Sequence, residues 1–200
     1  MTFSLTNGRL ILDLCGGTGD WSAPYRAAGY EVLVVDPHAL ATTAGGGVAS
    51  GAGDVRLFAY LDGRTVHGIL AAPPCTDFAV SGARWWAGKG EQALLDSLAV
   101  ADACIRIAFA HKPRWWVLEN PIGRLAGYIG PPRFIFDPCD FGDAYTKRTC
   151  LWGDFTIPTG TRVEPTEGSK MHLVAPGPDR QRIRSATPPG FSQAFFLANP

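Results

Sequence analysis

Two short segments of the 200-residue sequence combine reactive side chains with prolines that restrict the backbone. In the first, Pro73-Pro74-Cys75 follows an apolar run, so a thiol is expected just beyond the end of a strand. In the second, Glu119-Asn120-Pro121 follows the apolar run 115–118 and delivers a carboxyl group in the same way. A thiol and a carboxyl group at neighbouring strand ends could form one site for nucleophilic and acid–base catalysis.

A glycine-rich turn follows the first apolar run, residues 9–14. Its glycines would let the backbone approach a ligand closely at the start of the next helix. Asp36, at the end of the following apolar run, is placed to accept hydrogen bonds from ribose hydroxyls. The turn lacks the G-x-G-x-x-G fingerprint, which argues against a nicotinamide or flavin enzyme.

The elements that must position these residues alternate between strand and helix patterns. The alternation predicts an α/β fold, a mostly parallel Rossmann-like sheet with helices on both faces, whose ligands bind at the carboxyl ends of the strands. The expected strands are 9–14, 31–35, a short one near Val55, 68–71, 115–118, 133–136 and 149–152; the expected helices are 22–28, 91–110 and 191–198.

Composition indicates a single compact domain that can bury a substantial core, with 46% hydrophobic and 18% charged residues. No secretory leader or membrane span is recognised, so we expect a soluble cytoplasmic protein with no membrane partner. The five cysteines form no C-x-x-C pair and leave one over, which argues against a disulfide framework or a zinc ribbon. The four histidines show no metal-ligand spacing, and we assign no metal site.

The formal net charge is zero, so a global basic field for nucleic acid is missing. The basic segment 180–184, together with Lys147 and Arg148, could form a local edge that contacts phosphates. It could also be a solvated surface, and charge alone favours this second interpretation.

The ordered set of segments resembles the cytosine-C5 DNA methyltransferases over most of the chain. Residues 13–19 resemble their S-adenosylmethionine turn, and 53–55 the segment whose acid contacts the adenine of the cofactor. Residues 74–82 resemble the nucleophile loop, Glu119-Asn120 the pair that holds the target base, and 184–188 the Arg-x-x-Thr-Pro segment. Lys147-Arg148 resembles part of the later Gln-x-Arg-x-Arg strand.

This resemblance implies a methyltransferase fold, S-adenosylmethionine as cofactor, and duplex DNA with a flipped cytosine as substrate. It makes Cys75 the nucleophile that adds to cytosine C6, and Glu119 the acid that holds N3 and the exocyclic amine. Arg148 joins them as a catalytic residue, and Asn120 and Lys147 as substrate contacts. The implied cofactor contacts are Asp13, Cys15, Gly16, Gly17, Gly19, Asp36, Asp54 and Pro74.

The sequence departs from the family pattern at several positions. Cys15 replaces a common aromatic residue, Thr76 a common glutamine, and Cys150 the second arginine of the later strand. We divide the chain into a catalytic and cofactor-binding part (1–153), an irregular excursion with a reduced target-recognition segment (154–183), and a closing segment (184–200). So short an excursion predicts relaxed or short-sequence specificity, as in small phage-type methylases, or specificity supplied by a protein partner.

Two rival functions stay open. Residues 72–75 partly resemble the Asp/Asn/Ser-Pro-Pro-aromatic motif of amino-group methyltransferases, which act on adenine N6 or cytosine N4. The fit is incomplete, because the Ala72 side chain cannot accept a hydrogen bond from the target amine and Cys75 cannot stack on the base. A noncatalytic nucleic-acid or S-adenosylmethionine-binding descendant would also fit the neutral charge. The sequence does not distinguish protection of DNA against a nuclease, as in restriction–modification, from marking it for another purpose.

Overall fold

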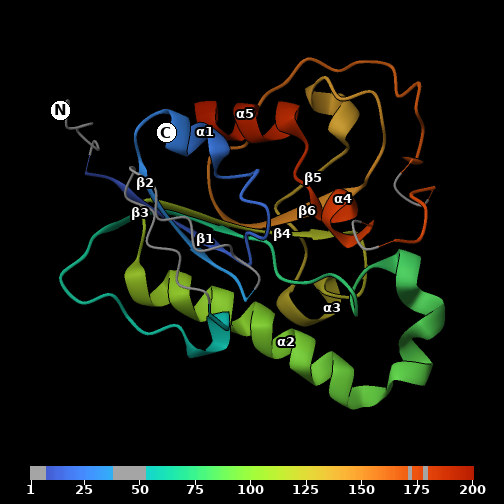
Figure 1. The fold of residues 1–200 in the computed structure, drawn as a ribbon, viewed down its shortest axis with the longest axis horizontal. Coiled ribbons are helices and arrows are strands. Elements are labelled where there is room, and N and C mark those ends of the chain that lie inside the picture. The colour runs from blue at the N-terminus through green and yellow to red at the C-terminus, as the bar shows by residue number, and fades with distance from the viewer. Residues whose placement is uncertain (1–7, 38–52, 171–172, 178–179) are drawn as a thin grey trace.

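The computed structural model describes residues 8–37, 53–170, 173–177 and 180–200. Within them, one sheet with strand order β2-β1-β3-β4-β6-β5 lies between two layers of helices (Figure 1). This confirms the expected α/β class. The strands are β1 (Leu10–Leu14), β2 (Glu31–Val35), β3 (Val66–Ala71), β4 (Trp115–Pro121), β5 (Phe134–Phe136) and β6 (Thr149–Asp154).

Strands β1 to β4 are parallel, and β6 runs antiparallel to both of its neighbours, β4 and β5. Since parallel strands end at the same edge of the sheet, the segments after β1, β2 and β3 meet the last residues of β4 there. This edge therefore collects the residues in which the sequence suggested chemistry.

The two faces of the sheet are covered by different helices (Figure 1). The long helix α2 (Trp86–His111) packs on one face together with the 3₁₀ helix η1 (Val55–Leu57) and α3 (Ala126–Ile129), while α1 (Ala23–Ala27) and α5 (Pro189–Ala198) cover the other. Successive side chains of β1 point to opposite faces of the sheet. Leu12 packs in the core beneath α2, and Ile11 packs in the core beneath α1 and α5.

The α1–α5 core is largely aromatic. Phe195 of α5 has its ring centroid 5.7 Å from those of Trp21 and of Trp115, both in edge-on arrangements. Tyr25 is fully buried and donates its hydroxyl to the Asn199 carbonyl at 2.8 Å. These contacts join the segment after α5 to the first helix of the chain.

Three sequence expectations need correction. The strand expected near Val55 is the 3₁₀ helix η1, whose N-cap is Asp54. Helix α2 as a whole begins at Trp86, but Gly90 is not helical, with a φ of +76°, so a short helical piece precedes the long helix that was expected from about residue 91. Strand β4 runs to Pro121 instead of ending at residue 118, because antiparallel pairing with β6 continues through Glu119 and Asn120.

The chain after β6 is irregular from residue 155 to 169, whereas the excursion expected over 154–183 begins with the last residue of β6 and ends inside a helix, α4 (Arg180–Ser185). The irregular stretch lies against the 3₁₀ helix η3 (Pro138–Phe141) and the loop that follows it. Val163 donates its amide to the Cys139 carbonyl at 2.8 Å, and Glu167 to the Ala144 carbonyl at 2.9 Å. The short helix α4 (Arg180–Ser185) then leads towards α5.

Candidate active site

The turn after β1 is held by β2. Cys15 donates its amide to the Val35 carbonyl at 2.8 Å, and Gly17 donates to Asp36 Oδ2 at 3.1 Å. Cys15 has a φ of +56°, which is uncommon for a residue other than glycine, and Gly19 has a φ of +72°. The structure thus brings the predicted residues of this turn together with Asp36.

Asp13 lies beneath the turn and is almost fully buried. Its Oδ2 accepts a hydrogen bond from the Ser22 hydroxyl, whereas its Oδ1 has no hydrogen-bond partner among the described residues. A Cβ at Gly16 would collide with this carboxylate, so glycine is needed there. Burial raises the pKa of Asp13 to about 6, although the Ser22 hydrogen bond and Arg26 oppose the shift.

An unpartnered buried carboxylate oxygen beside an exposed backbone turn suits a ligand that carries a positive charge. S-Adenosylmethionine has a sulfonium and an amino group, and the residues present fit it in this respect. Asp54, by contrast, directs its carboxylate to Arg56, with a 2.5 Å ion pair, while it caps η1. A contact from Asp54 to adenine stays a prediction that would compete with this pair.

Asp13→Asn is expected to change how stability depends on pH. Because the folded protein raises the pKa of Asp13 from 3.8 to about 6, its contribution is greatest below pH 4 and is lost as the pH rises through 6. A shift of about two units corresponds to about 3 kcal/mol. Between pH 4 and 7, the free energy of unfolding of the wild type should fall by this amount relative to Asp13→Asn, measured by urea unfolding.

The control is Asp154→Asn, which removes a carboxyl group whose side chain is 82% exposed. Its free energy of unfolding should follow that of the wild type across this range. Parallel curves for the wild type and Asp13→Asn would contradict the assignment.

The predicted nucleophile loop, residues 74–82, follows β3. The Cys75 carbonyl accepts hydrogen bonds from the amides of Phe78 and Ala79, at 3.0 and 2.9 Å, which closes a tight turn behind the half-buried thiol. Burial and then the charge of Glu119 raise the pKa of Cys75, whereas Lys147 and Arg184 oppose the shift. The thiol therefore shares its electrostatic surroundings with the carboxyl group predicted to act with it.

Asn120 supports this loop from β4. Its side chain is fully buried, and Nδ2 donates to the Pro73 carbonyl at 2.8 Å. Its Oδ1 has no hydrogen-bond partner among the described residues. In this arrangement Asn120 positions the backbone just before Cys75, while Pro74 is exposed beside it.

Asp77, two residues after the thiol, anchors the far side of the loop. Its carboxylate accepts hydrogen bonds from Lys89 Nζ at 2.7 Å and Ser97 Oγ at 2.8 Å, both from α2. The Asp77 carbonyl accepts from Arg124 Nε at 2.6 Å. Burial acts to raise the pKa of Asp77, but the hydrogen bonds from Lys89 and Ser97 outweigh it and the pKa is lowered.

Asp77→Asn is expected to lower both stability and catalytic efficiency. Loss of a charge-assisted hydrogen bond costs about 1.5 to 3 kcal/mol, to be measured as the free energy of unfolding. Small displacements of a reacting group can reduce the rate by up to about 100-fold, so we expect kcat/KM to fall roughly 10- to 100-fold. Lys89→Met should have a similar effect, and the double variant should lose less than the sum of the two.

Glu167→Gln is the matched control, because Glu167 pairs with Lys170 on the exposed surface. Exposed pairs contribute about 0 to 1 kcal/mol, so stability and kcat/KM should change little. If Asp77→Asn behaves like this control, Asp77 does not position the loop.

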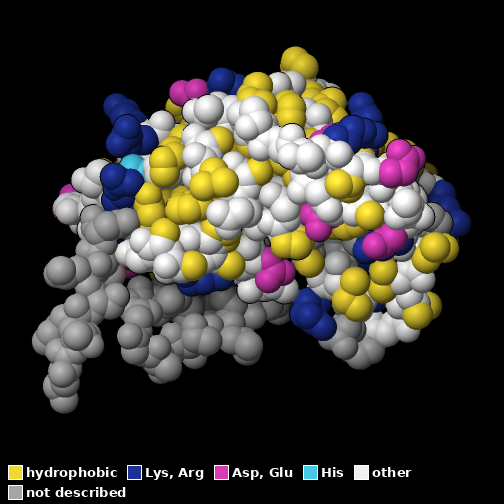
Figure 2. Space-filling model, turned by 90° about the horizontal axis from the view of Figure 1, so that it is seen from above, with side chains coloured by type: hydrophobic (Ala, Val, Ile, Leu, Met, Phe, Trp, Pro, Cys, Tyr) yellow, Lys and Arg dark blue, Asp and Glu magenta, His cyan; other side chains and the backbone are white. Residues whose placement is uncertain are grey.

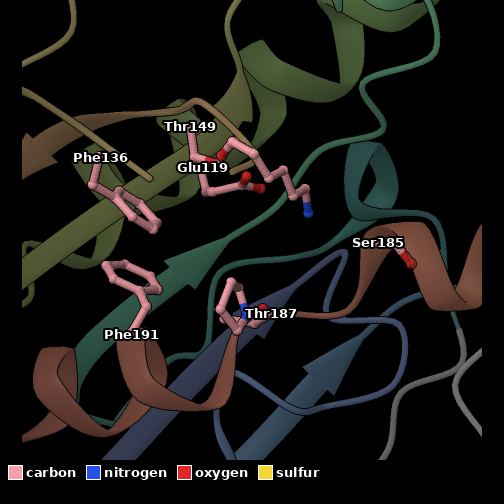
Figure 3. Close-up of a pocket in the computed structure, with 8 residues that line it drawn as sticks. Glu119, Phe136, Thr149, Ser185, Thr187 and Phe191 are labelled. Atoms are coloured by element: carbon pink, nitrogen blue, oxygen red, sulfur yellow. Dashed lines mark hydrogen bonds between the residues drawn. The ribbon is translucent and has the colours of Figure 1, made fainter. Parts of the chain in front are cut away.

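Glu119 lies in a small cavity between β4, β6 and the segment that joins α4 to α5. Figure 3 shows Glu119 and Thr149 on one side of it and Thr187 opposite, with Ser185, the last residue of α4, farther away. Phe136 and Phe191 stack at the far end, with ring centroids 4.1 Å apart. Burial raises the pKa of Glu119, and Lys147, which also lines the cavity, acts in the opposite direction.

The cavity encloses about 10 Å³, which is the space of a single water molecule. A nucleobase is larger than this space, so it could enter the cavity only if the segment 185–188 moved, although part of Glu119 is already exposed. The site therefore includes a wall formed by the chain between α4 and α5.

The two cations just before β6, Lys147 and Arg148, occupy different places. Lys147 lines the Glu119 cavity, but Arg148 lies on the surface with 62% of its side chain exposed, its guanidinium 3.5 Å from Asp137. Cys150 is buried in β6, and its pKa is raised by burial and by Glu119. A catalytic role of Arg148 stays a prediction, and the structure does not bring its side chain into this cavity.

Sequence reasoning missed several residues of the site. Lys89 and Arg124, which hold Asp77, come from elements distant in sequence. The only signal for them in the sequence is Asp77 itself, because a carboxylate beside a buried loop needs hydrogen-bond donors. Arg184 and Thr187 belong to the Arg-x-x-Thr-Pro segment, which the sequence did not connect with the site. In the structure, Thr187 lines the Glu119 cavity and the charge of Arg184 acts on the pKa of Cys75. Ser22 was assigned only to the start of a helix, yet its hydroxyl bonds to Asp13.

On the side that carries α1 and α5, the described residues do not form one continuous basic area. Figure 2 shows Lys and Arg side chains there in separate groups among apolar and uncharged ones. Among the described residues, no helix combines the length and apolar character needed to span a membrane. Nor do those residues contain a group of His, Cys, Asp or Glu suited to hold a metal ion.

Comparison with known proteins supports the fold. Neither the protein-family models nor the curated proteins gave a match to this chain. Among solved structures, the chain resembles one from E. coli named "putative DNA modification methyltransferase encoded within prophage Cp", with a TM-score of 0.52 and 16% sequence identity. The match covers 86% of this chain but only 56% of that chain, so the present chain spans little more than half of its length.

Proposed function

We propose that this protein is an S-adenosylmethionine-dependent DNA methyltransferase that modifies cytosine at C5. The observation that carries the proposal is the placement of the Cys75 thiol and the Glu119 carboxyl group at one strand-end edge, close enough for Glu119 to raise the pKa of the thiol. The similarity of fold to a protein named as a DNA modification methyltransferase is consistent with this chemistry.

Cys75 would add as a thiolate to C6 of the base, and the electron pair of the C5–C6 double bond would move towards C5. Glu119 would hydrogen-bond to N3 and the exocyclic amine and stabilise the charge that the ring accepts. Burial favours the protonated carboxyl group, which is the form that donates to N3. After C5 is methylated, loss of the C5 proton and departure of the thiolate would restore the ring.

The cofactor would lie over the turn after β1. S-Adenosylmethionine, when bound, supplies the electrophilic methyl group. Asp13 would face its positive charge, Asp36 its ribose and Asp54 its adenine, while Cys15, Gly16, Gly17, Gly19 and Pro74 would shape the site. Lys147 would contact the substrate beside Glu119, and Asn120 would act on the substrate indirectly, by holding the Pro73 carbonyl.

The cellular role proposed is that of a small phage-type modification enzyme in the cytoplasm of a bacterial host. It would protect or mark DNA, within a restriction–modification system or outside one. The short excursion 155–169 packs on the η3 region, and it would supply few base contacts, so recognition would be relaxed or shared with a partner.

Nucleoside mass spectrometry of mixed-sequence DNA, incubated with the protein and S-adenosylmethionine, tests the proposal. Formation of 5-methyldeoxycytidine is expected. N4-methyldeoxycytidine or N6-methyldeoxyadenosine would instead indicate an amino-group methyltransferase. If binding of S-adenosylmethionine or DNA occurs without any modified nucleoside, the protein is a binding descendant.

A further inference from the structure

A surface beside the nucleophile loop exposes apolar side chains that neighbouring elements leave uncovered. It is formed by the 3₁₀ helix η2 (Val80–Trp85) and the loop after β4. Val80, Trp85 and Ile122 are 57%, 59% and 46% exposed. The two segments are joined directly, because Val80 donates its amide to the Ile122 carbonyl at 3.1 Å.

Arginines surround these apolar side chains. The Arg84 guanidinium lies 4.9 Å from the Trp85 ring centroid, and that of Arg124 lies 4.3 Å from the ring of Trp86. Arg148 follows at the edge, since its carbonyl accepts the Ile122 amide at 3.1 Å. We call the set Val80, Arg84, Trp85, Ile122, Arg124 and Arg148 the η2 rim.

The composition of the η2 rim favours a nucleic acid over a protein partner. Three arginines accompany three exposed apolar side chains. Arg148 lies 3.5 Å from Asp137, whereas Arg84 and Arg124 form no ion pair among the described residues, and the nearby Asp77 carboxylate is already paired with Lys89. An aromatic ring backed by a guanidinium is a stacking platform for any base, because every base has a π face. Arginine side chains beside it can contact phosphates.

The bases that such a platform takes are unpaired ones, since both faces of a base inside a duplex are covered by its neighbours. The η2 rim is also continuous with the nucleophile loop: Arg124 holds the Asp77 carbonyl, and Val80 lies five residues after Cys75. A nucleotide stacked on Trp85 would thus lie on a surface joined to the loop that carries the thiol.

We propose, building on the function proposed above, that the η2 rim binds unpaired nucleotides next to the target cytosine, with one base stacked on Trp85. The substrate class that it favours is single-stranded or locally unpaired DNA. Sequence preference at this contact is weak, because stacking tolerates every base.

The test compares the wild type with Trp85→Ala and Trp85→Phe on a fluorescently labelled, cytosine-containing oligonucleotide, single-stranded or fully paired. Stacking of one base corresponds to about 1 to 3 kcal/mol, so Trp85→Ala should raise the Kd and the KM for the single strand roughly 5- to 150-fold, with kcat within about twofold. Trp85→Phe should restore most of the loss. The paired duplex should show a smaller effect.

Phe109→Ala is the control, because Phe109 is 70% exposed on α2 but lies outside the η2 rim. Equal Kd values for the wild type and Trp85→Ala would overturn the proposal, as would a loss confined to kcat. An equal loss for the paired duplex would overturn the preference for unpaired bases. Fluorescence anisotropy measures binding of the oligonucleotide whether or not the protein methylates it. The Kd therefore tests the η2 rim alone. Absence of a modified nucleoside would contradict the proposed enzyme activity and would leave the test of the η2 rim unaffected.

Discussion

Cys75→Ser is expected to abolish methylation of cytosine C5, with a loss of at least about 1,000-fold in rate. A serine hydroxyl keeps the shape of the side chain, but it is far less acidic and far less nucleophilic than a thiol, so addition to C6 fails. Binding of S-adenosylmethionine should be unchanged, because the cofactor contacts lie mainly on the turn after β1. Transfer of a labelled methyl group measures the first property and isothermal titration calorimetry the second.

Cys139→Ser is the control for this experiment. Cys139 is fully buried in η3, and it does not line the Glu119 cavity. The substitution should reduce stability without removing methylation. Retention of more than a tenth of the activity in Cys75→Ser would exclude the covalent mechanism.

The resting state of the thiol sets a condition on this mechanism. Burial and Glu119 raise the pKa of Cys75, so in the free protein the thiol form prevails at neutral pH. Lys147 and Arg184 oppose the shift, and Arg184 belongs to the helix that precedes the cavity wall. Movement of the segment 185–188, which would open the cavity beside Glu119 to a base, would thus also change the electrostatic surroundings of the proposed nucleophile.

The sequence predicted the sheet well where the signal was local. Runs such as 9–14 and 31–35 are buried on both faces, and apolar continuity followed by glycine or aspartate marked their ends. The prediction of a strand near Val55 was wrong, because one short apolar group fits a strand and a 3₁₀ helix equally well. The extent of β4 depends on pairing with β6, which is about thirty residues away and leaves no local trace.

The site was predictable only in part for the same reason. Cys75, Glu119 and Asp36 stand beside strand ends, so their types and positions were informative. The partners of Asp77 come from α2 and from the loop after β4, and no sequence spacing links them. Arg148 was assigned from its motif alone, and its exposed position beside Asp137 could not be read from the sequence.

Glu119→Gln is expected to lower methylation by roughly 100- to 10,000-fold while it makes the Cys75 thiol more reactive. The amide cannot give N3 the proton that the carboxyl group supplies, so the ring accepts electrons less readily. The negative charge that raises the pKa of Cys75 also disappears, which lowers that pKa and increases the thiolate fraction near pH 8. Nucleoside mass spectrometry measures the first effect, and peptide-resolved alkylation by iodoacetamide measures the second.

The opposite directions of these two effects separate a catalytic role from a structural one. A variant that merely disturbed β4 would lose methylation without a specific gain in alkylation at Cys75. Glu164→Gln, which removes an exposed carboxyl group of the excursion, should change neither property. If Glu119→Gln leaves the alkylation rate at the wild-type value, Glu119 and Cys75 do not share one site, and the arrangement that supports the proposed function is wrong.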